Sequence, residues 1–189
     1  HETALRRPFF ISEKKTLTGA EKGVATHTFM QYTDYEKASD NPMEERDRLV
    51  SKGYLTKNQG NAVDIDKIKI FFSSPLYKRI SNSYNIFRER KFLMKISDLE
   101  LNDKVGNEYK NTDGMLQGIA DCIFEEEDGF VLIDYKTDYV TDKFELINNY
   151  ARQLELYKLA LDKLYDKKIK EIYIYSFKLG ESVEIIINS

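Results

Sequence analysis

The first part of the chain repeats hydrophobic side chains at the spacing of α-helices. Thr18 and Glu21 have the spacing of a capping box, which predicts a helix over residues 18–35. The residues that repeat along one side of this helix are Val24, His27, Met30 and Gln31. Similar patterns predict helices over residues 43–51, 64–72 and 76–80. We therefore expect a mostly helical N-terminal part.

From residue 86 the pattern changes to the alternation that is typical of β-strands. We expect strands over residues 86–96, 115–124, 130–135, 169–177 and 183–187, a polar loop over residues 99–112, and an amphipathic helix over residues 143–165. This order is typical of an α/β fold in which helices flank a mixed β-sheet. A length of 189 residues favours a single domain over residues 1–189.

The hairpin within this sheet brings charged residues together. If Asp128-Gly129 is a two-residue turn, the facing pairs are Glu127 with Phe130, Ile123 with Asp134, and Asp121 with Lys136. Asp121, Asp134 and Lys136 then project from one face at one end of the hairpin. A three-residue turn would instead place Asp121 on the opposite face.

Two interpretations fit these three residues equally well. A carboxylate beside the apolar run at residues 130–133 must be paired or must bind a metal, because an isolated buried charge is costly. One interpretation is a salt bridge from Asp121 or Asp134 to Lys136. The other is a site for a hard divalent cation, which prefers oxygen ligands. A lysine there could orient or activate a water molecule.

Composition narrows the class of protein only a little. The net charge is −3, which gives a nucleic-acid-binding protein no global advantage. Several basic residues could line a positive channel, although we favour a solvated face: Lys78, Arg79, Arg88, Arg90, Lys91 and Lys95. Cys122 is the single cysteine, which fits a cytoplasmic location. No apolar run has membrane-spanning length, so we expect no membrane association.

Motifs in a fixed order extend over most of the chain. They are Gly23-x-x-x-His27, Arg88-Glu89, Gly118-Ile119-Ala120-Asp121, Asp134-Tyr135-Lys136-Thr137 and Gln153-x-x-x-Tyr157. Each motif alone is weak, but their order resembles the PD-(D/E)XK nucleases, and within them RecB-like nuclease domains of the AddA type. The resemblance runs from about residue 17 to residue 177. It implies a restriction-endonuclease-like fold with a helical N-terminal part.

The resemblance also implies roles for the motif residues. Asp121 and Asp134 match the metal-binding carboxylates, and Lys136 matches the catalytic lysine. Tyr135 matches the position whose backbone carbonyl reaches the metal, and His27 matches a histidine that binds it. Without the resemblance His27 would not stand out, because a lone histidine on a helix is more often packed or exposed.

The remaining motif residues are expected to support the site. Glu89 matches an acidic residue that supports the site, and the alternative is an ordinary ion pair with a neighbouring arginine on the strand. Gln153 and Tyr157 share one face of their helix. In the family they stand beside the site and touch DNA or the catalytic lysine. The alternatives are solvent exposure for Gln153 and core packing for Tyr157.

By resemblance we expect a Mg²⁺- or Mn²⁺-dependent deoxyribonuclease, an exonuclease on single-stranded DNA ends that a helicase produces in double-strand-break repair. The partners implied are DNA, a helicase domain upstream in the same chain and an AddB-like partner protein. The chain has no phosphate-binding loop of the motor type and begins at His1, so we expect a fragment of a longer protein or an added tag.

Other expectations stay open at this point. The AddB and Cas4 branches hold an iron–sulfur cluster with four cysteines, and a chain with one cysteine is not expected to hold one. One alternative function is a catalytically inactive DNA-binding or regulatory module of the same fold. Another is a free-standing RecB-like nuclease, for example a viral one.

Overall fold

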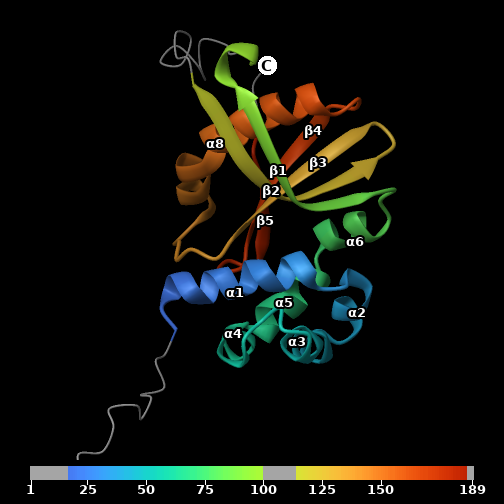
Figure 1. The fold of residues 1–189 in the computed structure, drawn as a ribbon, viewed down its shortest axis with the longest axis vertical. Helices are drawn as coiled ribbons and strands as arrows, with labels where there is room; N and C mark the ends of the chain where they lie inside the picture. The colour runs from blue at the N-terminus through green and yellow to red at the C-terminus, as the bar shows by residue number, and fades with distance from the viewer. Residues whose placement is uncertain (1–16, 100–113, 187–189) are drawn as a thin grey trace, which may run out of the picture.

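Helices cover both faces of a mixed β-sheet in a computed structural model that describes residues 17–99 and 114–186 (Figure 1). The strands are β1 (Ile86–Lys95), β2 (Met115–Glu126), β3 (Gly129–Lys136), β4 (Ile169–Ser176) and β5 (Glu181–Glu184). The helices are α1 (Gly19–Tyr32), α2 (Tyr35–Asp40), α3 (Pro42–Ser51), α4 (Lys57–Ala62), α5 (Ile65–Phe72), α6 (Pro75–Ser81) and α8 (Lys143–Leu164), with a short 3-10 helix, η1 (Ile96–Asp98), after β1.

The strands lie in the order β1-β2-β3-β4-β5. β3 and β4 are parallel, and the other neighbouring pairs are antiparallel. A parallel pair needs a crossover connection, and α8 provides it. α1 and the short helices that follow it lie on the opposite side of the sheet from α8 (Figure 1). The mixed sheet flanked by helices, with a helical N-terminal part, confirms the expected α/β architecture.

The central strand β3 is buried on both of its faces. Val131, Ile133 and Tyr135 belong to the core that the N-terminal helices form with the sheet. Phe130 and Leu132 belong to the core beneath α8. Side chains alternate between the two faces of a strand, so Asp134 and Lys136 continue the face that carries Phe130 and Leu132. The strand that anchors both cores thus ends in a carboxylate and an ammonium group.

The predicted helix over residues 18–35 is wrong at its C-terminal end, because α1 ends at Tyr32 and α2 begins at Tyr35. Thr18 and Glu21 do form the expected capping box. The break is fixed by the buried Glu45, whose carboxylate accepts a hydrogen bond from the backbone of Asp34 at 2.6 Å. This contact comes from α3, so no local pattern could reveal it.

α4 has no counterpart among the predicted helices. It begins with a capping box between Thr56 and Gln59, the same signal that marks α1. Gly60 in its middle lowers helix propensity, but a Cβ atom there would lie 2.5 Å from Val50 Cγ2. Close packing of α4 on α3 therefore requires glycine at this position.

The other elements agree with their predictions to within a few residues at each end. The larger differences are at β5, which spans Glu181–Glu184 where residues 183–187 were expected, and after β1, where residue 96 begins η1 and does not extend the strand. The loop expected over residues 99–112 lies almost entirely outside the described residues, and so does residue 187.

The predicted register of the hairpin is wrong. Glu126 pairs with Gly129, so the turn residues are Glu127 and Asp128, and the last pair is Cys122 with Ile133. Gly129 has another reason to be glycine, because a Cβ atom would lie 2.8 Å from the carbonyl oxygen of Lys168.

Relative to the prediction, each residue of β2 faces a partner two positions nearer to the turn. An even shift leaves the alternation of faces unchanged. Asp121 and Asp134 therefore occupy the positions directly beyond the last pair of the two strands, and Lys136 lies one alternation further along β3.

A charged network holds α6 against the sheet at the opposite end of these strands. Arg79 donates to Glu126 at 2.9 Å and to Glu171 at 2.6 Å. Lys170 adds an ion pair with Glu126 at 2.6 Å. The hydrogen bond from Arg79 lowers the pKa of Glu126 from 4.5 to about 2. Arg79 thus keeps two neighbouring carboxylates charged.

We expect Arg79→Met to lower the free energy of unfolding by about 1–3 kcal/mol at pH 7, because two carboxylates lose their hydrogen-bonded partner. A carboxyl with a lowered pKa stabilises the folded state above its unfolded pKa and loses this contribution as the pH falls through the folded pKa. The difference from the unmodified chain should therefore shrink between pH 4.5 and about 2. Urea denaturation at several pH values measures it.

Lys69→Met is the matched control, since it removes an exposed ion pair with Asp66 at 3.8 Å. Its effect should stay below about 1 kcal/mol. Equal losses in the two variants would contradict the account of the network.

Candidate active site

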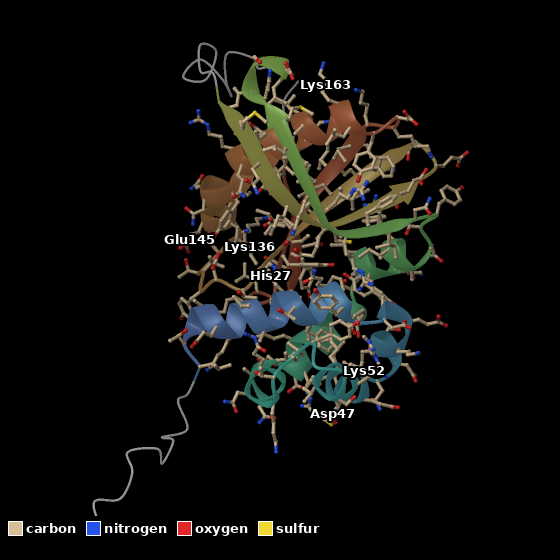
Figure 2. All side chains as sticks on the ribbon, in the orientation of Figure 1. His27, Asp47, Lys52, Lys136, Glu145 and Lys163 are labelled. Atoms are coloured by element: carbon tan, nitrogen blue, oxygen red, sulfur yellow. The ribbon has the colours of Figure 1, made fainter. Side chains whose placement is uncertain are left out.

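The candidate site lies where β2 and β3 stop pairing, between α1 and the first half of α8. His27 of α1 and Lys136 at the end of β3 are both labelled in Figure 2, in the region where α1 meets the sheet. Most of the surrounding strand residues are buried, whereas His27, Asp121 and Lys136 keep partial exposure. Charged groups are therefore gathered at an edge of the apolar core that solvent can reach.

His27 and Asp121 form the first contact of the site. Nδ1 of His27 lies 3.6 Å from Oδ2 of Asp121, and the same oxygen accepts a hydrogen bond from the backbone N–H of Tyr135 at 2.7 Å. Burial lowers the pKa of His27, but the hydrogen bonding and charge of Asp121, together with the charge of Asp134, outweigh it, so the net pKa is raised above 6.5. The contact joins α1 to β2 and β3 through one carboxylate.

Glu89 of β1 completes a cluster with these two residues. One ligand atom from each of His27, Glu89 and Asp121 lies within 4.8 Å of the other two. Burial raises the pKa of Glu89, and the nearby charge of Asp121 raises it further. Glu89 also has a φ of 51°, a conformation that costs free energy in a residue other than glycine. Backbone strain and charge repulsion therefore coincide at this residue.

Asp134 and Lys136 form a second charged pair beside this cluster. Nζ of Lys136 lies 2.7 Å from Oδ2 of Asp134, and it stands over the ring of Tyr150 at 4.2 Å from the centroid. Asp134 is 6% exposed, and its Oδ2 has no hydrogen bond of ordinary geometry. Burial raises the pKa of Asp134, while the charge of Lys136 opposes the shift. The salt bridge that the sequence allowed is thus present between these two residues.

The contact of Tyr150 with Lys136 is a feature of the site that the sequence analysis misses. The hydroxyl of Tyr150 also donates to Asp138, just beyond β3. The signal available in the sequence is its position one helical turn before Gln153, on the helix that the motifs already mark.

Two contacts fix the position of α1. Gly23 packs so closely on the end of β3 that a Cβ atom would lie 2.6 Å from Oγ1 of Thr137. At the other end of the helix, Arg88 donates hydrogen bonds to the carbonyl oxygens of Met30 and Thr33. Both Gly23 and Arg88 belong to motifs in the sequence, and both act here on the placement of His27.

The predicted stripe along α1 is only partly buried. Met30 is 1% exposed and faces the core, whereas Val24 is 57% exposed. Val24, His27 and Gln31 instead line a cleft of about 680 Å³ next to Glu89. The face of α1 that carries the histidine is therefore the wall of the cleft.

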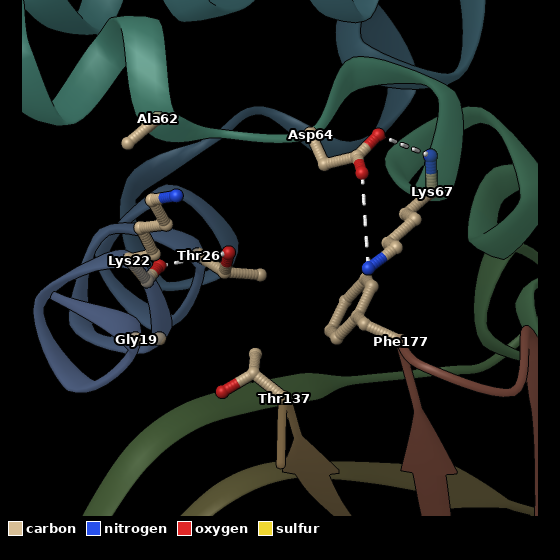
Figure 3. Close-up of a pocket in the computed structure, with 9 residues that line it drawn as sticks. Gly19, Lys22, Thr26, Ala62, Asp64, Lys67, Thr137 and Phe177 are labelled. Atoms are coloured by element: carbon tan, nitrogen blue, oxygen red, sulfur yellow. Dashed lines mark hydrogen bonds and ion pairs between the residues drawn. The ribbon is translucent and has the colours of Figure 1, made fainter. Parts of the chain in front are cut away.

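A second hollow of about 340 Å³ is also lined by Gly23 and Thr137 (Figure 3). Lys22, Lys67 and Asp64 line it. The two hollows share Gly23 and Thr137, so they adjoin at the point where α1 meets β3.

Gln153 and Tyr157 contact each other, with Nε2 of Gln153 donating to the Tyr157 hydroxyl at 3.0 Å. The ring of Tyr157 packs on Phe92, with the centroids 4.9 Å apart. Gly118 lies beneath both rings, and a Cβ atom there would be 2.3 Å from Phe92. Packing thus explains why residue 118 is glycine and why residue 157 is aromatic. A direct role of Gln153 and Tyr157 at the site stays a prediction.

The family model of the PD-(D/E)XK nuclease superfamily matches residues 3–183. The chain belongs to the PD-(D/E)XK nuclease superfamily. The mixed sheet with its flanking helices is the restriction-endonuclease-like arrangement expected for this superfamily.

The PD-(D/E)XK chain is also similar to proteins named as subunits of ATP-dependent helicase/nucleases. It is 45% identical to one from Thermoanaerobacter sp. (strain X514) over 184 residues, which cover 95% of this chain and 15% of the relative. It is 40% identical to one from Clostridium botulinum (strain Okra / Type B1), over 96% of this chain and 14% of the relative. The chain therefore spans a small part of the length of these curated relatives.

Nucleases of the PD-(D/E)XK superfamily use divalent metal ions, and the donor atoms present here suit such an ion. Two carboxylates and an imidazole converge in the described part of the site, and the carboxylate of Asp134 is buried beside them in its ion pair with Lys136. Carboxylate oxygens are the ligands that hard cations prefer.

Within the described ranges, no helix is both long enough and apolar enough to cross a membrane.

We expect Gly23→Ala to lower the free energy of unfolding by about 1–3 kcal/mol, because the added methyl group overlaps Oγ1 of Thr137. The double variant Gly23→Ala/Thr137→Ala should recover most of this loss, since the remaining Cβ of residue 137 lies at an ordinary distance of 3.8 Å. Thermal or urea unfolding of the two single variants and the double variant measures the coupling.

Gly19→Ala is the matched control, because nothing lies within 4 Å of its added Cβ atom. Strictly additive losses in the double variant would contradict the direct contact between α1 and β3.

Proposed function

We propose that this chain is a divalent-metal-dependent nuclease domain that hydrolyses phosphodiester bonds of DNA. The observation that carries the proposal is the convergence of His27, Glu89 and Asp121 beside the Asp134–Lys136 pair, in a chain of a nuclease superfamily. Three acidic groups near one another favour a bound cation, because the cation relieves their mutual repulsion.

We propose His27, Asp121, Asp134 and the backbone carbonyl of Tyr135 as the ligands of Mg²⁺ or Mn²⁺. Glu89 is a further candidate, since its carboxylate already lies within 4.8 Å of the donor atoms of His27 and Asp121. A divalent cation held there would polarise a phosphate and lower the pKa of a water molecule.

The protein's own groups would orient the reaction. Lys136 carries a positive charge at the rim of the site, where it would hold a water molecule or phosphate oxygen by hydrogen bonding. Its pairing with Asp134 at 2.7 Å and its contact with Tyr150 fix the position of the ammonium group. The hydrogen bond from Tyr135 N–H similarly holds Asp121 in one orientation.

The finer substrate assignment rests on the relatives' names. Because the similar proteins are named as helicase/nuclease subunits, we propose exonucleolytic cleavage of single-stranded ends that a helicase domain upstream in the same chain exposes. An AddB-like partner and a role in cytoplasmic DNA repair and recombination belong to the same proposal. Gln153 and Tyr157 would lie beside the path of the strand.

We expect Asp121→Asn to reduce the cleavage of linear single-stranded DNA by about 100-fold or more in Mg²⁺ or Mn²⁺. Asparagine keeps the side-chain volume and can still accept the hydrogen bond from Tyr135 N–H, so the change removes mainly the charge. Release of labelled nucleotides measures the rate, and EDTA should abolish it in the unmodified chain.

Asp128→Asn serves as the control, because this exposed carboxylate lies in the hairpin turn and pairs with Lys170. It should leave the rate unchanged. Full activity of Asp121→Asn, or equal activity with EDTA, would refute the proposed site. Metal binding without any cleavage of DNA would favour an inactive binding module of the same fold.

A further inference from the structure

An exposed aromatic side chain stands at the rim of the cleft that contains the acidic cluster. Tyr139, in the segment between β3 and α8, is 81% exposed. It lines the same cleft of about 680 Å³ as His27 and Glu89. Aromatic rings gain free energy when they are buried, so an exposed tyrosine beside the cleft can gain free energy by packing against a ligand.

The segment that carries Tyr139 is fastened on both sides. Asp138 accepts a hydrogen bond from the hydroxyl of Tyr150, and Val140 is 3% exposed. The exposure of Tyr139 is therefore enforced by its two neighbours in the chain.

The α1 wall of the cleft carries an exposed apolar side chain among polar ones. Val24 of α1 lines the cleft and is 57% exposed. An aliphatic and an aromatic side chain thus line the same cleft as the imidazole of His27 and the carboxylate of Glu89. This arrangement suits a ligand with a flat apolar part and an anionic part.

Lysine side chains lie against the ring of Tyr139 and in the adjoining hollow. Nζ of Lys178 stands 4.3 Å from the centroid of the Tyr139 ring. The adjoining hollow carries Lys22 and Lys67, the latter 3.7 Å from Asp64 (Figure 3). Lysine side chains next to an exposed ring are the combination with which proteins bind single-stranded nucleic acid.

We propose that Tyr139 stacks on a base of single-stranded DNA next to the phosphate that is cleaved. The inference rests on the proposed nuclease function and adds the residue that selects the substrate. In a duplex each base is stacked on its neighbours and paired, so its face is not available to the tyrosine. A single strand can place one base against Tyr139 and Val24 while its phosphate enters the acidic cluster.

A tryptophan reporter tests the stacking without any cleavage. The chain contains no tryptophan, so Tyr139→Trp gives a single indole whose fluorescence reports contact with a base. With Ca²⁺ in place of Mg²⁺ or Mn²⁺, a thymidine oligonucleotide should quench this fluorescence in a saturable manner, because the cation offsets the repulsion between the acidic cluster and the phosphate. An abasic oligonucleotide of equal length, which keeps the phosphates, should not quench it, and neither should a blunt duplex.

Tyr84→Trp is the matched control. Tyr84 is also exposed, at 67%, and also has a lysine near its ring, with Nζ of Lys167 at 5.8 Å from the centroid, but it lies before β1 at the hairpin-turn end of the sheet. Its indole should not respond to DNA. Equal quenching in both variants, or quenching by the abasic strand, would overturn the proposal.

A second measurement separates this inference from the proposed function. Tyr139→Ala should weaken the binding of single-stranded DNA by about 5- to 100-fold and lower its cleavage at subsaturating concentrations by a similar factor. Mn²⁺ affinity should be unchanged, because the side chain is not a metal ligand. Unchanged binding and cleavage of single strands in this variant would refute the role of Tyr139 alone, whereas the absence of cleavage in the unmodified chain would contradict the proposed function.

Discussion

The crowding of carboxylates at the edge of an apolar core is the constraint on which the site depends. Glu89 and Asp121 lie close together, and the pKa values of Glu89 and Asp134 are raised by burial and by neighbouring negative charge. Such a group of acids persists only when cationic and hydrogen-bonding partners offset the repulsion. The partners are the imidazole of His27, the ammonium group of Lys136 and the backbone N–H of Tyr135.

These partners come from α1 and from the end of β3, and the acids come from β1, β2 and β3, so the fold can be understood as the means of bringing them together. α1 supplies His27, and the close contact of Gly23 with Thr137 sets its height above the sheet. β3 supplies Lys136, and α8 supports it through Tyr150. These contacts leave the acids only partly compensated, which is the condition in which a divalent cation gains most from binding.

The helices and strands that could be predicted from the sequence are those that a pattern of neighbouring residues determines. β3 was recognisable as a continuous apolar run, and the structure buries it on both faces because helices pack on each side. The long helix was found almost to the residue, since its apolar repeat extends over many turns. The break after α1 depends on Glu45 of α3, a contact between distant residues that no local pattern contains.

The hairpin register and the arrangement of the site likewise depend on contacts between residues that are distant in the sequence. Asp128-Gly129 carries a strong turn signal, but Gly129 is glycine because the carbonyl of Lys168 lies against it. The candidate site residues were proposed from the order of the motifs, whereas their arrangement could not be predicted from it. Glu89 approaches His27 and Asp121 because β1 pairs with β2 and because its backbone adopts a positive φ, and neither fact is visible in the sequence.

The central claim is that His27 and Asp121 hold one divalent cation between α1 and the sheet. Anomalous diffraction from crystals soaked in MnCl₂ locates such an ion directly. The account predicts a manganese peak within coordinating distance of the His27 imidazole and the Asp121 carboxylate, and the loss of this peak in an Asp121→Asn crystal. A manganese site elsewhere with none at these two residues would contradict it.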